Sequence, residues 1–149
     1  LQQLNYTTGS GGYTNSTTPS IWPSKGVITS PYGTRVDPVT GAASAFHEGV
    51  DIADDYGTPI VATAAGTVTF AGYTEGGYGN LVEIDHGNGF VTRYGHNSAV
   101  LVTPGMTVKQ GQVIALMGST GKSTGAHVHY EVRINGSAVD PMVFLPISN

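Results

Sequence analysis

The stretch HVHYEVRI, residues 127–134, alternates apolar and polar side chains with a period of two residues. Successive side chains of a β-strand point to opposite faces, so this period predicts a strand with one buried face. The face toward a core would carry Val128, Tyr130, Val132 and Ile134. The opposite face would carry His127, His129, Glu131 and Arg133. Strand geometry would hold the two imidazoles roughly 7 Å apart above the sheet.

The rest of the chain has the composition of a mainly β protein. It contains 22 glycines among 149 residues, only 11% of its residues are charged, and no segment has a sustained helical period. Apolar stretches bounded by Gly, Asn and Pro predict further strands at 66–73, 80–86, 90–96 and 112–118. The sequence HGNG at 86–89 predicts a hairpin turn. We therefore expect an antiparallel sheet with hairpins and long loops, and a groove above the central sheet.

The first 25 residues differ from the remainder. Residues 1–25 are polar, rich in Gly, Ser and Thr, and without apolar periodicity. Such a segment buries too little apolar surface to offset the entropy of ordering it. This pattern predicts a tail or linker at 1–25 and one domain at 26–149. Trp22 is the exception, because it either docks on the domain or stays a partly exposed aromatic residue.

Charge and residue usage exclude several classes of function. The net charge is −4 and no cluster of Lys and Arg is present, which argues against a nucleic-acid partner. No apolar run approaches membrane-spanning length, so we expect no membrane insertion by this segment. The chain contains no cysteine, which excludes disulfides, a thiolate zinc site and a cysteine nucleophile.

The loop GSTGKSTG, residues 118–125, has three alternative explanations. GKST at 121–124 is typical of phosphate loops, but position 116 is Leu where that motif needs Gly, and a strand follows instead of a helix. Ser119 and Lys122 have the spacing of a serine nucleophile and its base, but the partner motifs of such enzymes are missing. The third alternative is a solvated strand face that happens to carry two histidines.

A second polar pattern strengthens a fourth alternative, a metal site. FHEGVDIA at 46–53 places His47 and Asp51 four residues apart, so an extended chain points both to one side. Gly49 between them leaves room for close approach of backbone or ligand. A carboxylate flanked by apolar residues needs a cation or several N–H donors. Because three imidazole or carboxylate ligands with one open position make a catalytic zinc site, the choice is between catalytic zinc and no metal.

Together these residues resemble the lysostaphin-type, or LytM-type, zinc endopeptidases of the M23 peptidase family. The resemblance covers roughly residues 29–145 and rests on H-x-x-x-D at 47–51 with G-x-T-G-x-S-T-G-x-H-x-H at 118–129. GTPIVATAAGTVTFAG at 57–72 and GYGNLVEIDHGNGFVTRYGH at 77–96 match as well. The family cuts peptides of bacterial peptidoglycan. The resemblance therefore implies a barrel-sandwich-like peptidase domain, zinc as cofactor, and peptidoglycan peptides as substrate.

The resemblance also implies roles for five residues. His47, Asp51 and His129 match the zinc ligands of the family. His127 and His96 match its active-site histidines, which would serve as general acid and base. Zinc lowers the pKa of a bound water to about 7 and polarises the scissile carbonyl, and histidine titrates near neutral pH. The sequence leaves open which of the two histidines is the base.

Several neighbouring residues have more than one interpretation. His86 fits a hairpin-turn or capping role better than metal ligation. Glu131 either orients an imidazole, pairs with a neighbouring arginine or is solvated. Asn80 and Tyr94 could line the groove, although tyrosine on a strand usually packs. Arg35 either braces the loop before the first ligand or touches substrate, and we favour bracing.

Three classes of function remain. The first is an active zinc endopeptidase, which its substrate would place outside the cytoplasmic membrane: secreted, periplasmic or on the cell surface. The second is a catalytically silent cell-wall binding or activator module on the same fold, against which the complete ligand set argues. The third is a biotinyl- or lipoyl-type carrier with similar apolar hairpins, but the lysine turn of such carriers is missing. The sequence does not indicate an oligomeric state.

Overall fold

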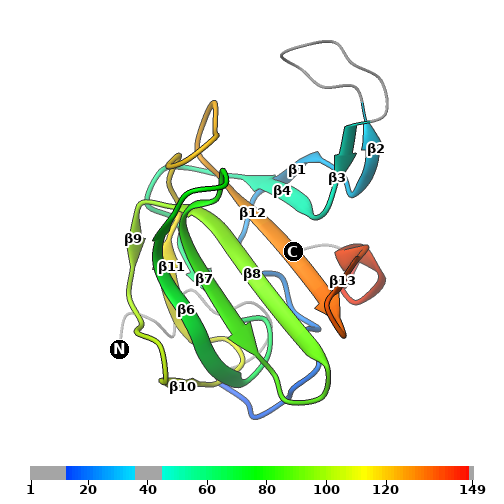
Figure 1. Cartoon of the computed structure of the whole chain (residues 1–149), viewed down its shortest axis with the longest axis vertical. Helices are drawn as coiled ribbons and strands as arrows, with labels where there is room; N and C mark the ends of the chain where they lie inside the picture. The colour runs from blue at the N-terminus through cyan, green and yellow to red at the C-terminus, as the bar shows by residue number, and fades with distance from the viewer. Residues whose placement is uncertain (1–12, 36–44, 148–149) are drawn as a thin grey trace.

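The computed structural model describes residues 13–35 and 45–147, and its elements are almost all β-strands. The main sheet has the order β1-β4-β12-β8-β7-β6-β10, and β13 pairs with β12 (Figure 1). Its strands are β1 Val27–Ser30, β4 Val50–Ala53, β6 Gly66–Thr74, β7 Gly79–Asp85, β8 Phe90–Asn97, β10 Thr107–Val108, β12 His127–Ile134 and β13 Ser137–Val139. All neighbours in this sheet are antiparallel, which confirms the predicted fold class.

The stretch HVHYEVRI forms β12, which lies inside the main sheet between β4 and β8. Three of the four residues predicted for its apolar face, Val128, Tyr130 and Val132, have no exposed area, whereas Ile134 at the end of the strand is half-buried. Its polar face carries the two histidines, which are half-buried, and Glu131, which is fully buried. The period of two therefore identified both the strand and the direction of its core.

The other predicted strands are present, with ends that differ by one or two residues. The stretches 66–73, 80–86 and 90–96 correspond to β6, β7 and β8. The predicted stretch 112–118 contains the shorter strand β11 Val113–Leu116. The HGNG turn is closed by the His86 backbone N–H, which donates to the Phe90 carbonyl at 2.9 Å. These local signals were sufficient because each strand is bounded by its own turn residues.

A smaller sheet, in the order β5-β11-β9, closes the other side of the core. It consists of β5 Pro59–Val61, β11 and β9 Ala99–Val100. Ile60 and Ile114 from this sheet join Val50, Val82 and Tyr130 from the main sheet in one apolar cluster. The molecule therefore has a single core between two sheets, as a barrel-sandwich-like domain requires.

The described residues before β1 contact this core. Trp22 is 5% exposed and belongs to the apolar cluster, and its Nε1–H donates to the Pro146 carbonyl at 3.2 Å. Thr14 forms an antiparallel bridge with Gln110. Of the two alternatives for Trp22, docking on the domain is therefore the one found. The predicted division at residues 25 and 26 stays a prediction, and residues 1–12 lie outside the described part of the chain.

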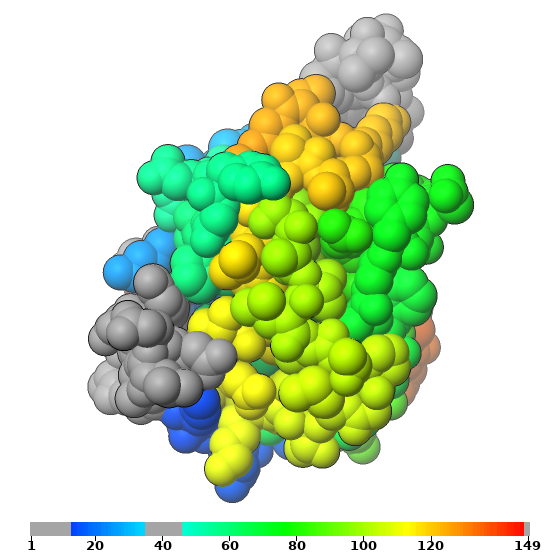
Figure 2. Space-filling model, turned by 90° about the vertical axis from the view of Figure 1, so that its left-hand side faces the viewer, coloured from blue at the N-terminus to red at the C-terminus, as the bar shows by residue number. Residues whose placement is uncertain are grey.

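Two connections at one end of the main sheet position the site. They are the β6–β7 hairpin turn at 75–78 and the loop 117–126 that leads from β11 into β12. Figure 2 shows the amber surface of this loop at one end of the molecule, with green surface from the β6–β7 hairpin beside it. At the chain end, Pro141–Val143 forms a short 3-10 turn, η2. No helix in the described residues is long and apolar enough to cross a bilayer.

Candidate functional site

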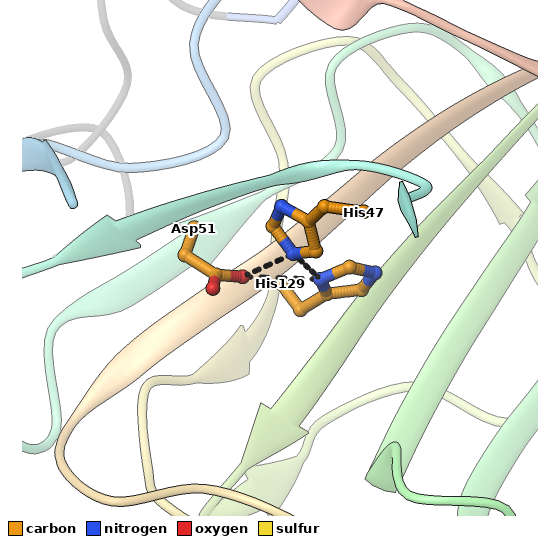
Figure 3. Close-up of side chains that lie close together, drawn as sticks. All are labelled: His47, Asp51 and His129. Atoms are coloured by element: carbon orange, nitrogen blue, oxygen red, sulfur yellow. Dashed lines mark hydrogen bonds and ion pairs between the residues drawn. The ribbon is translucent and has the colours of Figure 1, made fainter. Parts of the chain in front are cut away.

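Three potential metal ligands from three strands meet beside β12. They are His47 at the end of β3 Ala45–His47, Asp51 on β4, and His129 on β12. The His47 Nε2 lies 3.3 Å from the Asp51 Oδ1 and 3.2 Å from the His129 Nδ1, and the latter lies 3.0 Å from the same oxygen (Figure 3). The three atoms therefore point toward one common place.

The segment 46–53 reaches this site by a different course from the continuous extended stretch that we expected. It is interrupted after His47, so that β3 pairs with β2 Gly33–Arg35 and β4 pairs with β1 and β12. Gly49 lies in the interruption, where an added Cβ would be 2.3 Å from the Tyr130 carbonyl oxygen. The predicted close approach at Gly49 is therefore an approach of the β12 backbone. His47 and Asp51 still face the same side despite the break.

The second ring nitrogen of each histidine is held by an acceptor. The His47 Nδ1 lies 2.9 Å from the Pro31 carbonyl oxygen, and the His129 Nε2 lies 2.8 Å from the Glu131 Oε2. Since a carbonyl and a carboxylate only accept, these nitrogens carry the protons. The His47 Nε2 and, in a neutral ring, the His129 Nδ1 then turn lone pairs toward each other and toward Asp51. Such an arrangement of acceptors is stabilised by a cation between them, so the donor set fits a divalent metal ion.

The charges of the site are strongly coupled. For His129, burial disfavours the cation, but hydrogen bonds to Asp51 and Glu131 outweigh burial and raise the pKa to about 9. Burial alone would raise the pKa of Asp51, but the hydrogen bond from the protonated His129 and the nearness of the His47 ring hold it well below its usual value. The protein without metal therefore keeps one positive charge at this place, in the form of a proton on His129.

Glu131 fulfils two of the roles considered for it. It is 1% exposed, accepts a hydrogen bond from the Tyr78 hydroxyl at 2.6 Å and also pairs with the Arg133 Nε at 2.9 Å. Burial opposes its ionisation, but the hydrogen bond from His129 and that from Tyr78 lower its pKa to about 2. Glu131 thus orients the imidazole as an anion and is neutralised by the arginine at the same time.

The two remaining candidate histidines lie next to the ligand set. The His96 and His127 ring centroids are 4.6 Å apart, and the His127 Nε2 is 3.7 Å from the Asp51 Oδ1. The His96 Nδ1 donates to the Thr120 carbonyl at 2.7 Å, and the His127 Nδ1 donates to the Gly125 carbonyl at 2.9 Å. In a neutral ring, Nε2 is then the nitrogen that carries the lone pair. Burial lowers the pKa of His96 to about 4, so its ring is neutral near pH 7.

The local backbone explains how His96 reaches the cleft from the end of β8. Its φ is 66°, a left-handed conformation that is uncommon for residues other than glycine. Its backbone N–H donates to the Tyr78 carbonyl at 2.7 Å, and its ring bonds to the loop 117–126. Hydrogen bonds to two neighbouring loops thus hold a strained backbone at the candidate site, a combination typical of functional residues.

These side chains line one cleft of about 620 Å³. Besides the five predicted residues, its walls contain residues that sequence reasoning did not select: Phe46, Glu48, Gly76, Gly77, Tyr78, Lys122, Ser123 and Thr124. Glu131, considered as a supporting residue, is also in the wall. Tyr78 had a signal in the sequence, since an aromatic residue inside a glycine-rich hairpin turn has no strand face to pack on.

Four other candidates have different surroundings. Tyr94 has no exposed area and bonds to Thr63, so it packs in the core and does not line the cleft. Asn80 is absent from the cleft wall and donates to the Asn97 carbonyl at 3.0 Å. His86 bonds to the Ala65 carbonyl and to a threonine hydroxyl, in keeping with the expected hairpin role. The side chain of Arg35 lies outside the described part of the chain.

Sequence comparisons give this geometry a family context. The family model described as Peptidase family M23 matches residues 45–141. The DD-carboxypeptidase/endopeptidase Mpg of Neisseria meningitidis is 49% identical over 120 residues, or 80% of this chain and 27% of that protein. The murein hydrolase activator NlpD of Escherichia coli is 40% identical over 125 residues, or 84% of this chain and 31% of that protein. The chain therefore spans less than a third of either relative.

Solved structures agree with the fold. A zinc-containing peptidase from Vibrio cholerae superposes with a TM-score of 0.76 at 36% identity, covering 90% of this chain and 41% of the other. The catalytic domain of lysostaphin from Staphylococcus simulans superposes with a TM-score of 0.72 at 34% identity, covering 79% of this chain and 90% of the other. The predicted lysostaphin-type fold is thereby confirmed.

Proposed function

The chain belongs to peptidase family M23, and on this basis we propose that it is a zinc-dependent endopeptidase that cuts peptides of bacterial peptidoglycan. The observation that supports this most is the meeting of His47, Asp51 and His129 next to two further histidines in an open cleft. The first three would hold the metal, and the cleft would admit a peptide.

The donor set is that of a catalytic zinc site. Two imidazoles and one carboxylate leave one position open, and hydrogen bonds from the far ring nitrogens to the Pro31 carbonyl and the Glu131 carboxylate fix the orientation of both rings. A zinc ion held there would polarise the scissile carbonyl and make a bound water acidic enough to act as nucleophile near pH 7. The buried Glu131 would keep His129 electron-rich as a ligand.

His96 and His127 would transfer the protons. Each ring has its Nδ1–H bonded to a backbone carbonyl and therefore presents Nε2 as the acceptor. One ring would take the proton of the attacking water and return it to the leaving amine. Neither the formation of the new C–O bond nor the cleavage of the C–N bond then leaves an unstable charge. The 4.6 Å between the ring centroids supports a role for both rings at a single scissile bond.

The relatives support a proposal for the substrate and the compartment. The name of one of them refers to an endopeptidase and that of another to an activator of murein hydrolases, which supports peptidoglycan stem or bridge peptides as the substrate. Peptidoglycan lies outside the cytoplasmic membrane, so we propose an extracytoplasmic location: secreted, periplasmic or on the cell surface. The peptidase domain would comprise residues 26–149, and residues 1–25 would be the segment that precedes it.

The similarity to NlpD favours one alternative, a catalytically silent module that activates other wall hydrolases. The complete set of three donors and two histidines in this chain argues against it. The two functions differ in one property: an activator does not need to cut peptides by itself, whereas an endopeptidase releases peptide fragments from purified walls without a partner.

The test is digestion of purified cell walls, followed by mass analysis of the fragments. We expect fragments from the zinc-loaded protein, none after chelation, and recovery when zinc is added back. His47→Ala and Asp51→Ala should lose both zinc and activity, whereas His96→Ala and His127→Ala should keep most zinc and lose turnover. A protein that holds zinc but releases no peptide from any wall type would favour the activator.

A further inference from the structure

The cleft contains one ammonium group that the proposed chemistry does not use. Lys122 lies in the loop 117–126 and lines the cleft together with Ser123 and Thr124. Its side chain is exposed, and no carboxylate among the described residues forms an ion pair with it. An unpaired cation beside a peptide-binding cleft attracts an anionic group of a ligand.

The two arginines near the site differ from Lys122 in this respect. The Arg93 Nε bonds to the Glu83 Oε2 at 2.7 Å. The Arg133 Nε bonds to Glu131 at 2.9 Å, and its NH2 group bonds to Glu48 at 2.8 Å. Their charges are already compensated within the protein. Among the described residues around the cleft, Lys122 is therefore the cation that remains available to a ligand.

The backbone of Lys122 is held in a defined position. Its N–H donates to the Gly77 carbonyl at 2.9 Å, in the β6–β7 hairpin turn. The preceding Gly121 has a φ of 72°, and a Cβ there would lie 2.4 Å from the Gly79 nitrogen, so the loop and the hairpin are in close contact. The neighbouring Thr120 carbonyl accepts the hydrogen bond from His96. The backbone of Lys122 is thus fixed relative to His96, a candidate catalytic histidine, whereas the flexible side chain leaves the ammonium group free to turn.

We propose that Lys122 selects peptides that carry a free carboxylate beside the scissile amide, such as a cross-link through a diamino acid, over uncharged bridges such as oligoglycine. The proposal rests on the endopeptidase function proposed above and adds the charge of its substrate. Lys122 acts on specificity, because its ammonium contacts a substrate group that does not react.

The test uses two synthetic peptides of one sequence, in which the carboxylate beside the scissile amide is either free or converted to a primary amide. Both are offered to the zinc-loaded wild type, Lys122→Met, Lys122→Arg and the control Lys109→Met. Lys109 is also exposed, but it does not line the cleft. The readouts are kcat/KM and, by calorimetry, Kd, so that specificity is measured in binding as well as in turnover.

We expect the wild type to prefer the free carboxylate by about three- to fivefold in low salt, the size of one partly exposed ion pair. Lys122→Met should remove most of this preference, with a larger loss of kcat/KM for the free-carboxylate peptide than for the amide peptide. Lys122→Arg and Lys109→Met should retain it, and added salt should reduce it. Equal losses for both peptides, or a preference that survives in Lys122→Met, would overturn the proposal. If no variant cuts either peptide, the endopeptidase function fails, and the Kd values still decide the role of Lys122.

Discussion

The Nε2 of His47 lies 3.2 Å from the Nδ1 of His129, although the two residues are 82 positions apart in the chain. Each ring is turned this way because its other nitrogen bonds to an acceptor, the Pro31 carbonyl for one and the Glu131 carboxylate for the other. The orientation is therefore built into the protein by hydrogen bonds and by the strands that carry the residues. The predictions below test the parts of this construction separately.

Glu131→Gln should weaken zinc binding by about 10- to 100-fold, the usual cost of losing a partner that orients a ligand. The variant removes the anion that bonds the His129 Nε2, while the three proposed ligands stay in place. Competition with a chelator of known affinity measures the effect. The matched control is Glu83→Gln, which removes a carboxylate bonded to Arg93 but to no imidazole. Equal zinc affinities of the two variants would show that Glu131 does not orient His129.

Zinc uptake by the metal-free protein should release about one proton from His129 at pH 7. The pKa of this group is raised to about 9, so the ring is protonated at pH 7, but a ligand must be neutral. The apparent affinity for zinc should therefore rise with pH up to about pH 9. Calorimetry in buffers with different ionisation enthalpies measures the released proton. A binding enthalpy that is independent of the buffer would contradict the prediction.

The same shift has a consequence for the stability of the metal-free protein. Folding raises the pKa of His129 from near 6.5 to about 9. This shift stabilises the folded protein fully below pH 6.5, and the stabilisation is lost as the pH rises through about 9. Glu131 acts in the opposite sense. Its pKa of about 2 stabilises the fold above the unfolded value near 4, and this contribution disappears as the pH falls toward 2. Urea unfolding of the metal-free protein between pH 2 and 10 should show both losses.

Gly49→Ala should lower the free energy of unfolding by about 1 to 3 kcal/mol, the range for overpacking a tight site. The added Cβ would lie 2.3 Å from the Tyr130 carbonyl oxygen, so β12 or the turn before β4 must move. Zinc affinity should fall as well, since His47 and Asp51 flank this turn. Gly125→Ala is the control, because a Cβ there meets nothing within 4 Å. Unchanged stability of Gly49→Ala would show that the close approach is not required.

Trp22→Ala should lower the free energy of unfolding by about 3 to 5 kcal/mol, as expected for a large buried aromatic residue. The side chain is 5% exposed and packs in the core, and its indole N–H bonds to Pro146 near the other end of the chain. Circular dichroism during urea unfolding measures the loss. Tyr73→Ala, which removes a side chain that is 61% exposed, should have little effect. A small loss for Trp22 would indicate that residues 13–25 contribute little to the domain.

Much of the fold could be predicted because the decisive signals are local. The alternation along HVHYEVRI identified β12 and its buried face, and glycine-bounded stretches identified β6, β7 and β8. A metal site shared by residues 47 and 51 and the H-x-H pair was one alternative from the residues themselves, but the choice of His129 over His127 as the ligand was reached only through the family resemblance. Neither spacing by itself determines which strands become neighbours.

Other features depend on contacts that no local pattern contains. The break between β3 and β4 arises because β3 pairs with β2, whereas β4 pairs with β12. Tyr94 and His96 are two positions apart on β8, so a regular strand would point both to one face. Tyr94 is buried, however, and the left-handed backbone at His96 turns the His96 side chain in a different direction. Lys122 was considered only in the phosphate-loop and serine-nucleophile alternatives. Its place in the cleft wall depends on the contact between its loop and the β6–β7 hairpin.

The most direct test of the central claim is a crystal structure of the zinc-loaded protein with anomalous data collected at the zinc edge. We predict one strong peak, about 2.0 to 2.2 Å from the His47 Nε2, the Asp51 carboxylate and the His129 Nδ1, the distances usual for zinc and these donors. No peak at this place, or a zinc ion bound only by other residues, would contradict the claim.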